Sequence, residues 1–95
     1  MPQPTTLYLI AYDISSDKRR TRVHKTLSAY GRWTQYSLFE CFLTRLQHVD
    51  LMARLAALID SEADSLRLYP LCDGCVKRVE TMGDPTPEEP TIFLL

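Results

Sequence analysis

The side chain best suited to chemistry is a carboxylate at the end of an apolar run. Thr6 to Ile14 is rich in β-branched, aromatic and aliphatic residues and predicts a buried strand, with Asp13 at its exit. An exposed carboxylate there would suit Mg²⁺, which takes one or two protein carboxylates and keeps several waters. The ion would activate water and neutralise a phosphate. The structural alternative, which local evidence alone favours, is that Asp13 caps the turn through Ser15 or pairs with Arg20.

Basic residues are concentrated directly after this aspartate. The formal net charge is -1, yet one short stretch holds six of the eleven Lys and Arg residues: Lys18, Arg19, Arg20, Arg22, Lys25 and Arg32. In a helix, Lys18, Arg22 and Lys25 would project from one side, because they follow i, i+4, i+7 spacing. Together with Arg19 and Arg32, they could bind a nucleic-acid backbone without base-specific contacts. A charged stripe is nevertheless more often a solvated helix face.

Five further side chains are candidates near the aspartate. Arg20 lies close to the apolar stripe of the same helix, so we expect it to point toward the strand exit, where it would bind a phosphate or pair with a nearby carboxylate. Tyr12, Tyr36 and Phe39 could stack on bases, although packing in the core or an interface is the more common role. Ser37 could contact a phosphate, and no catalytic triad is evident around it.

The second pattern with chemical potential is a CxxC pair, Cys72 and Cys75. Structural zinc usually has four ligands, and only Cys41, His24 and His48 remain to complete such a set. A thioredoxin-like redox pair would lie near a βαβ pattern, whereas this pair follows the last predicted strand. We therefore favour an ordinary buried turn over metal or redox function. The two histidines are interpreted as surface residues without a role in proton transfer.

The elements that must position these residues alternate between strand and helix signals. A helix from about Asp17 to Tyr30 follows the N-cap candidates Ser15 and Ser16 and is stopped by Gly31. Two short antiparallel strands follow within Trp33 to Leu43 and meet near Phe39 to Cys41. A second helix begins with the capping-box form Thr44 to Gln47. The last element of this order is a strand from Leu66 to Leu71, which Pro70 and Gly74 stop. This order predicts a ferredoxin-like α+β sandwich, an antiparallel sheet with both helices on one face.

Length and composition fit one small domain. The 95 residues are 45% hydrophobic, which allows one core over residues 1–83, followed by a Pro-rich linker and an apolar, strand-forming tail at Thr91 to Leu95. We expect residues 84–95 to reach a sheet edge, its own or that of a second copy. The sequence has no apolar run of about 20 residues and no start typical of a signal peptide, which predicts no membrane contact. Its odd number of cysteines does not fit a secreted disulfide framework, so we expect a cytoplasmic protein.

Four segments together resemble the family of CRISPR-associated protein two, the small prokaryotic partner in spacer acquisition. The segments are Tyr12-Asp13-Ile14, the basic helix start Asp17 to Arg22, Gly31 followed by Gln35-Tyr36-Ser37-Leu38-Phe39-Glu40, and Asp64-Ser65-Leu66-Arg67-Leu68-Tyr69-Pro70-Leu71. The resemblance covers about residues 7 to 83, in order. It departs from the family pattern between Gly31 and Gln35, which is shorter here, so Arg32 is not assigned to the family arginine that lies nearer the glutamine.

The resemblance implies a ferredoxin-like fold, a homodimer and a C-terminal strand that packs on the partner subunit. It also implies a phosphodiesterase that uses Mg²⁺ or Mn²⁺, one ion shared by two subunits, on single-stranded RNA or duplex DNA. By position, Asp13 matches the metal-binding aspartate and Tyr12 its neighbour. The other catalytic positions that the resemblance transfers are Arg20, Arg22, Ser37 and Phe39.

Two other functions stay open at this point. The dimer could be a non-catalytic adaptor that bridges the CRISPR integrase subunits and grips the spacer duplex with its basic stripes. A stand-alone, toxin-like ribonuclease is the third alternative. RNA and DNA are equally compatible with the sequence, because a surface that binds phosphates carries no signature for the 2′-hydroxyl.

Overall fold

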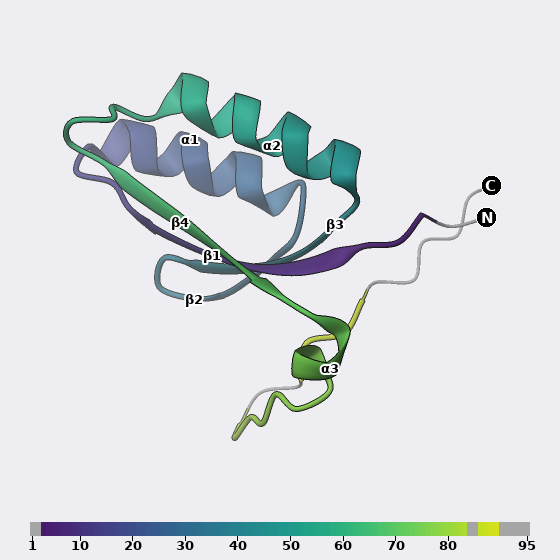
Figure 1. Cartoon of the computed structure of the whole chain (residues 1–95). Coiled ribbons are helices and arrows are strands. Elements are labelled where there is room, and N and C mark those ends of the chain that lie inside the picture. The colour runs from purple at the N-terminus through teal and green to yellow at the C-terminus, as the bar shows by residue number, and fades with distance from the viewer. Residues whose placement is uncertain (1–2, 84–85, 90–95) are drawn as a thin grey trace.

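A four-stranded antiparallel sheet forms one layer of the protein and two helices form the other (Figure 1). The computed structural model describes residues 3–83 and 86–89. The elements in chain order are β1 (Thr6–Asp13), α1 (Asp17–Ser28), β2 (Arg32–Gln35), β3 (Leu38–Leu43), α2 (Arg45–Leu58), β4 (Ser65–Leu71) and the short helix α3 (Asp73–Val76). The strands lie in the order β2-β3-β1-β4, which places β1 in the middle of the sheet. The predicted ferredoxin-like α+β fold is confirmed.

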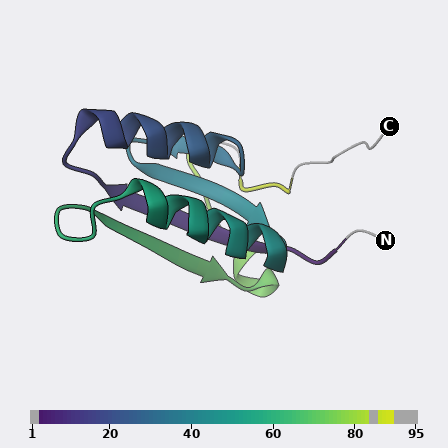
Figure 2. The same cartoon turned by 90° about the horizontal axis from the view of Figure 1, so that it is seen from above.

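Both long helices lie side by side over the same face of the sheet (Figure 2). Ile10 of β1 and Phe39 of β3 are fully buried beneath them, together with Val23 and Leu27 of α1 and Leu51 of α2. A hydrogen bond from the Tyr30 hydroxyl to the Asp50 carboxylate links the end of α1 to α2. The core therefore fills the space between sheet and helices and fixes the direction in which β1 ends.

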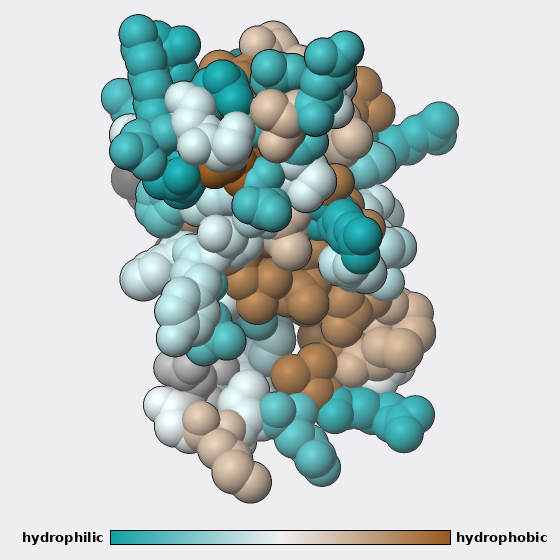
Figure 3. Space-filling model, turned by 90° about the vertical axis from the view of Figure 1, so that its left-hand side faces the viewer, coloured by the Kyte–Doolittle hydropathy of each residue, from teal (hydrophilic) through white to brown (hydrophobic). Residues whose placement is uncertain are grey.

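The opposite face of the sheet is open and largely apolar. Because side chains alternate along a strand, Leu9 and Ala11 of β1 point away from the helices, and Leu38 of β3 and Tyr69 of β4 share their side through the strand register. Tyr69 is 45% exposed. Figure 3 shows hydrophobic side chains gathered below the helix layer. These apolar side chains are suited to packing against another apolar surface.

The short helix α3 lies on this open side, at the end where β4 finishes (Figure 1). It packs against β1 and β4, and Leu7 beside it is only 2% exposed. Cys72 and Cys75 belong to this segment and both are exposed. The expectation of an ordinary buried turn was therefore wrong, because a one-turn helix at the sheet's end has no second layer to cover it.

Several element boundaries differ from the sequence prediction for local reasons. The strands β2 and β3 meet at Tyr36 and Ser37 rather than near 39–41. Tyr36 turns the chain with a φ of 48°, and its carbonyl accepts a 2.7 Å hydrogen bond from the Trp33 indole. Pro70 lies within β4 instead of stopping it, which an edge strand tolerates because one side of the strand has no partner.

Gly31 has a different role from the one expected. Helix α1 ends at Ser28, with Ala29 as its C-cap. A Cβ atom on Gly31 would lie 2.3 Å from Cys41 Sγ and 2.4 Å from the Glu40 carbonyl oxygen. Glycine is therefore needed here because the chain passes directly over β3.

The predicted tail and part of the linker lie outside the described residues. This applies to Thr91 to Leu95 and to residues 84–85 and 90. Within the described linker, Glu89 accepts a hydrogen bond from the Thr5 hydroxyl, which brings this segment back to the start of β1. None of the helices among residues 3–83 and 86–89 is long and apolar enough to cross a membrane.

Candidate functional site

Asp13 lies at the last position of β1 with its side chain exposed. Its neighbour Tyr12 points toward the helices, so alternation along the strand directs Asp13 to the open face of the sheet. Across the ladder it pairs with Ser65 of β4. Among residues 3–83 and 86–89, the Asp13 carboxylate has no hydrogen bond or ion pair. Its oxygens are therefore available to an external ligand.

Other residues perform the capping role that was the structural alternative for Asp13. The Ser16 side chain is the N-cap of α1 and accepts a 3.3 Å hydrogen bond from the Arg19 backbone N–H. The Ser15 backbone N–H and hydroxyl both donate to Asp64, over 3.1 and 3.3 Å. The turn after β1 is thus held without any contribution from Asp13.

Asp64 is a buried anchor that the sequence analysis did not single out. Its side chain is fully buried and accepts hydrogen bonds from Arg19, from Ser15 and from the Asp60 backbone N–H. These donors, the Arg19 guanidinium above all, hold the Asp64 pKa well below its ordinary value. No local spacing signals this role, because Asp64 and Ser15 are far apart in the sequence.

Arg19 is consequently engaged within the fold. Its Nε donates to Asp64 Oδ2 over 2.8 Å and its Nη2 donates to Asp64 Oδ1 over 3.2 Å. The Arg19 side chain is 30% exposed, so only part of the guanidinium reaches the surface. As a nucleic-acid contact it offers less free charge than its neighbours on α1.

Arg20 is held at the strand exit, where the sequence analysis placed it. Its Nε and Nη2 donate to the Ile14 carbonyl oxygen over 3.2 and 3.0 Å, and its Nη1 donates to Asp17 over 2.6 Å. The pair with Asp17 is one of the roles considered from the sequence. The Arg20 side chain is 43% exposed. Its charge is therefore fixed beside the end of β1 and accessible from outside.

Tyr12, Ser37 and Phe39 form a packed group behind the strand end. Tyr12 is 7% exposed and its hydroxyl shares a 3.2 Å hydrogen bond with Nδ1 of His24. Burial raises the Tyr12 pKa, while the nearby Arg20 charge and a hydrogen bond with Ser37 act in the opposite direction. The Tyr12 backbone N–H donates to the Ser37 carbonyl over 3.1 Å. Phe39 is fully buried, so it acts on any site through packing alone.

The two histidines are not the plain surface residues that we expected. His24 lies between the Phe39 ring, 5.0 Å away, and the Trp33 ring, 6.1 Å away. His48 stacks on Tyr8 with ring centroids 4.7 Å apart. Both are half-buried, because each helix turns its histidine toward the sheet. The contacts of His24 with Tyr12 and Phe39 are what sequence reasoning missed.

The basic stripe predicted on α1 is present. Lys18, Arg22 and Lys25 are all exposed, and within the described parts of the chain none of them has an ion pair. Helix α1 is 12 residues long, about 18 Å, and begins just after Asp13. The stripe thus extends from the strand exit along the exposed side of the helix.

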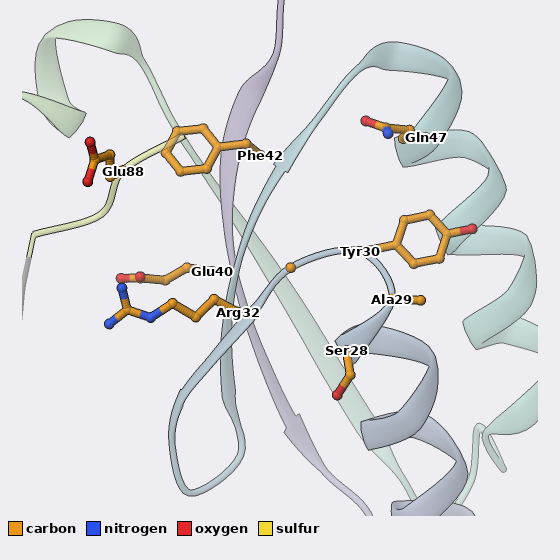
Figure 4. A pocket seen from close by; sticks show the side chains of 9 residues that line it. Ser28, Ala29, Tyr30, Arg32, Glu40, Phe42, Gln47 and Glu88 are labelled. Atoms are coloured by element: carbon orange, nitrogen blue, oxygen red, sulfur yellow. The ribbon is translucent and has the colours of Figure 1, made fainter. Parts of the chain in front are cut away.

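Arg32 lies apart from the basic stripe on α1. It begins β2 beyond the far end of α1, in register with Glu40 of β3. Figure 4 shows the two side chains pointing toward one another. They lie at the edge of a hollow of about 450 Å³ between the chain after α1 and the described linker, which is lined by Ser28, Ala29, Tyr30, Gly31, Arg32, Glu40, Phe42, Gln47 and Glu88. Neither Asp13 nor the basic stripe contributes to this hollow.

The donor set at the strand exit suits an ion that keeps most of its water. No group of three or more His, Cys, Asp or Glu side chains gathers around a possible ion within residues 3–83 and 86–89. At the exit of β1, the described residues therefore offer one unengaged carboxylate, that of Asp13. A hard cation such as Mg²⁺ fits this set, whereas structural zinc does not.

Comparisons with known proteins agree on one family. The model of the family described as CRISPR associated protein Cas2 matches residues 6–79. A curated relative, CRISPR-associated endoribonuclease Cas2 1 of Synechocystis sp., is 43% identical over 93 residues, which cover 94% of this chain and 99% of the relative.

Two solved structures show the same likeness in three dimensions. The crystal structure of a hypothetical protein from Thermus thermophilus is 40% identical with a TM-score of 0.77, and the match covers 88% of this chain and 99% of that one. A chain of a partial Cas6-RT–Cas1–Cas2 complex is 27% identical with a TM-score of 0.74, over 95% of this chain and 99% of that one.

Proposed function

Since this chain belongs to the CRISPR-associated Cas2 family, we propose that it is a metal-dependent endonuclease that cleaves phosphodiester bonds in RNA or DNA. The observation that carries the proposal is the state of Asp13. It is the exposed carboxylate at the end of the central strand, and no described residue engages it. The hydrogen bonds that cap the turn after β1 are instead accepted by the Ser16 side chain and by Asp64. The curated relatives named endoribonuclease point to RNA as the first substrate to test.

The active unit that we propose is a homodimer. At the strand exit a single chain offers the one unengaged carboxylate of Asp13, while the described residues leave Leu9, Ala11, Leu38 and Tyr69 on the other sheet face without a covering layer. Pairing two copies through this face would bury apolar surface, and each Å² removed from water contributes about 25 cal/mol. Because Asp13 points to the same side, a two-fold axis would also bring two Asp13 carboxylates toward one another.

Asp13 from each subunit would hold one Mg²⁺ or Mn²⁺ ion between them. The ion, when bound, supplies a water nucleophile at neutral pH and charge to offset that of the phosphate. Arg20, fixed by the Ile14 carbonyl and Asp17, directs positive charge to the same strand exit and stabilises the charge that develops on phosphorus oxygens. Arg22 and the rest of the basic stripe bind the flanking phosphates. Tyr12, Ser37 and Phe39 position the strand end from behind.

The test compares two exposed carboxylates. Asp13→Asn should lower the rate of cleavage of a labelled single-stranded RNA, measured with Mg²⁺, by at least about a hundredfold. Glu62→Gln in the loop before β4 is the matched control, since it also removes one exposed negative charge but leaves Asp13 and Arg20 in place. Circular dichroism and sedimentation should show both variants folded as the wild type. Unchanged cleavage by Asp13→Asn, in a preparation shown to be free of other nucleases, would exclude the proposed role of Asp13.

A second function, as adaptor in spacer acquisition, is favoured by one specific observation. The chain resembles a chain of a solved complex that contains Cas1 and Cas2. In this role the dimer bridges integrase subunits and its basic stripes grip a DNA duplex. Lys18 and Arg22 would then matter more than Asp13, because they are exposed and form no ion pair in the described structure.

The two functions are separable in one experiment on spacer acquisition in cells. Charge reversal of both Lys18 and Arg22 should abolish acquisition, while Asp13→Asn should leave it intact if the adaptor role is sufficient. Arg54→Glu on α2 is a control for charge reversal elsewhere on the helix layer. Duplex affinity of the purified protein should fall with salt at a log-log slope of about -0.9 for each phosphate contact. Acquisition that survives the Lys18 and Arg22 reversal would exclude the adaptor role of the stripe.

A further inference from the structure

Two cysteines lie in contact on the surface at the end of β4. Cys72 directly follows the strand and serves as N-cap of α3, and Cys75 lies within the single turn of that helix. Both are free and exposed, and their Sγ atoms are 3.2 Å apart. The Cys72 Sγ also accepts a 3.3 Å hydrogen bond from the Cys75 backbone N–H. This contact has no part in the proposed nuclease or adaptor function.

We propose that Cys72 and Cys75 form a reversible dithiol–disulfide site that exchanges with low-molecular-weight disulfides such as glutathione disulfide. The reduced pair already has the arrangement that a disulfide needs, two thiols on one turn with adjacent sulfurs. A disulfide requires an S–S distance of about 2.05 Å, so closure needs about 1 Å of approach. Rotation of two exposed side chains supplies this movement without disturbing the sheet.

The environment makes Cys72 the attacking thiol. Hydrogen bonds from the Cys75 thiol and from the backbone N–H of Cys75 lower the Cys72 pKa, and the same contact raises that of Cys75. Cys41, by contrast, is fully buried in the core, and this burial raises its pKa to about 12. Of the three cysteines, Cys41 therefore stays inert while the exposed pair reacts.

The exchange has two steps with balanced electrons. The Cys72 thiolate attacks one sulfur of glutathione disulfide and forms a mixed disulfide, and one glutathione leaves as thiolate. Cys75, after loss of its proton, attacks the Cys72 sulfur and displaces the second glutathione. Two cysteine thiols are oxidised to one disulfide, one glutathione disulfide is reduced to two glutathione molecules, and excess reduced glutathione reverses both steps.

The pair lies where oxidation would have a structural effect. Helix α3 packs on β1 and β4 and sets the direction in which the chain leaves the sheet toward the linker. A disulfide would fix this turn and remove its freedom to unwind. A zinc site is the less favoured use of the pair, because the described chain offers no third ligand beside it.

The test uses the full-length protein in buffers with different ratios of oxidised to reduced glutathione. After quenching with acid and alkylation, intact mass and peptide mapping should show one intramolecular disulfide between Cys72 and Cys75, with Cys41 still alkylated as a thiol. Its formation should be fully reversed by reduced glutathione. Under native conditions, iodoacetamide should modify Cys72 at least about tenfold faster than Cys41.

Matched variants separate the roles of the two sulfurs. Cys75→Ser should accumulate the mixed disulfide of glutathione with Cys72, because the resolving thiol is missing. Cys72→Ser should form much less adduct on Cys75 in the same time. Both substitutions are on the surface, and circular dichroism should show them folded. A wild type that gives only mixed disulfides, only disulfides between chains, or no oxidation in glutathione disulfide alone would overturn the proposal.

Discussion

The Asp64 carboxylate lies 2.8 Å from Arg19 Nε, and this partly buried pair joins the first turn of α1 to the loop before β4. The same carboxylate accepts the Ser15 backbone N–H and the Asp60 backbone N–H. The turn after β1 and the loop before β4 are therefore joined by the hydrogen bonds of one buried carboxylate, which we call the Asp64 lock. The position of Asp13 depends on this lock, although Asp13 takes no part in it.

Asp64→Ala should destabilise the protein strongly. The substitution removes the acceptor of two backbone N–H groups and leaves the half-buried Arg19 without its partner. We expect the melting temperature to fall by about 10 °C or more. Glu62→Gln in the same loop is the control, because it removes one exposed negative charge outside the lock. Equal melting temperatures for Asp64→Ala and Glu62→Gln would contradict this account of the loop.

Acid should weaken the fold through the same residue. The Asp64 pKa is lowered in the folded protein relative to its ordinary value of about 3.9. Its stabilising effect is therefore fully present above that value and is lost as the pH falls below it, toward the lower pKa of the folded state. Denaturant unfolding from pH 6 to pH 3 should show a steeper loss of stability in the wild type than in Asp64→Ala. Parallel curves would assign acid sensitivity to other carboxylates.

Gly31→Ala should be poorly tolerated, because the new Cβ would overlap Cys41 Sγ and the Glu40 carbonyl oxygen. The backbone oxygen cannot rotate away, so we expect a loss of about 1 to 3 kcal/mol in the free energy of unfolding. Gly74→Ala is the matched control. There the nearest atom, Cys72 Sγ, lies 3.9 Å away, and alanine should be neutral or stabilising by up to about 1 kcal/mol in helix α3. Denaturant titrations of both variants decide the matter, and equal losses would refute the steric argument.

Leu9→Lys should prevent dimerisation through the open sheet face. Leu9 lies on the central strand between Tyr69 of β4 and Glu40 of β3, so a lysine there would place a charged side chain within the apolar part of the proposed interface. The dimer dissociation constant should rise by on the order of a hundredfold, measured by sedimentation equilibrium. Val49→Lys on α2 is the control, because Val49 is 59% exposed on the helix layer. A dimer unaffected by Leu9→Lys would place the interface elsewhere.

Local patterns in the sequence were sufficient for the order of the four strands and the two long helices. The capping box at the start of α2 is present as predicted, with Gln47 N–H donating to Thr44 Oγ1 and Thr44 N–H donating to Gln47 Oε1. The turn between β2 and β3 was misplaced, because Tyr36 adopts its positive φ without a Gly or Pro to signal it. This turn is stabilised by a specific contact, the hydrogen bond from the Trp33 indole to the Tyr36 carbonyl, and not by a residue type that favours turns.

The candidate site was predictable only in part, and the missing part is long-range. Spacing along one helix placed Arg20 and the basic stripe correctly on the surface of α1. The same reasoning grouped Arg19 with them, since its partner Asp64 belongs to a loop that only the folded chain brings near. His24 was expected to be a plain surface residue for the same reason, because its contacts with Tyr12 and Phe39 cross from helix to sheet.

The Asp13 carboxylate, which has no hydrogen bond or ion pair among the described residues, has an evolutionary consequence. If Asp13 holds the proposed ion, a single substitution there would end catalysis while the hydrophobic core, the Asp64 lock and the basic stripe are inherited intact. Selection on cleavage and selection on assembly would then act on different residues of one small protein. A chain without this carboxylate would keep the fold and the basic surface that the proposed adaptor role requires.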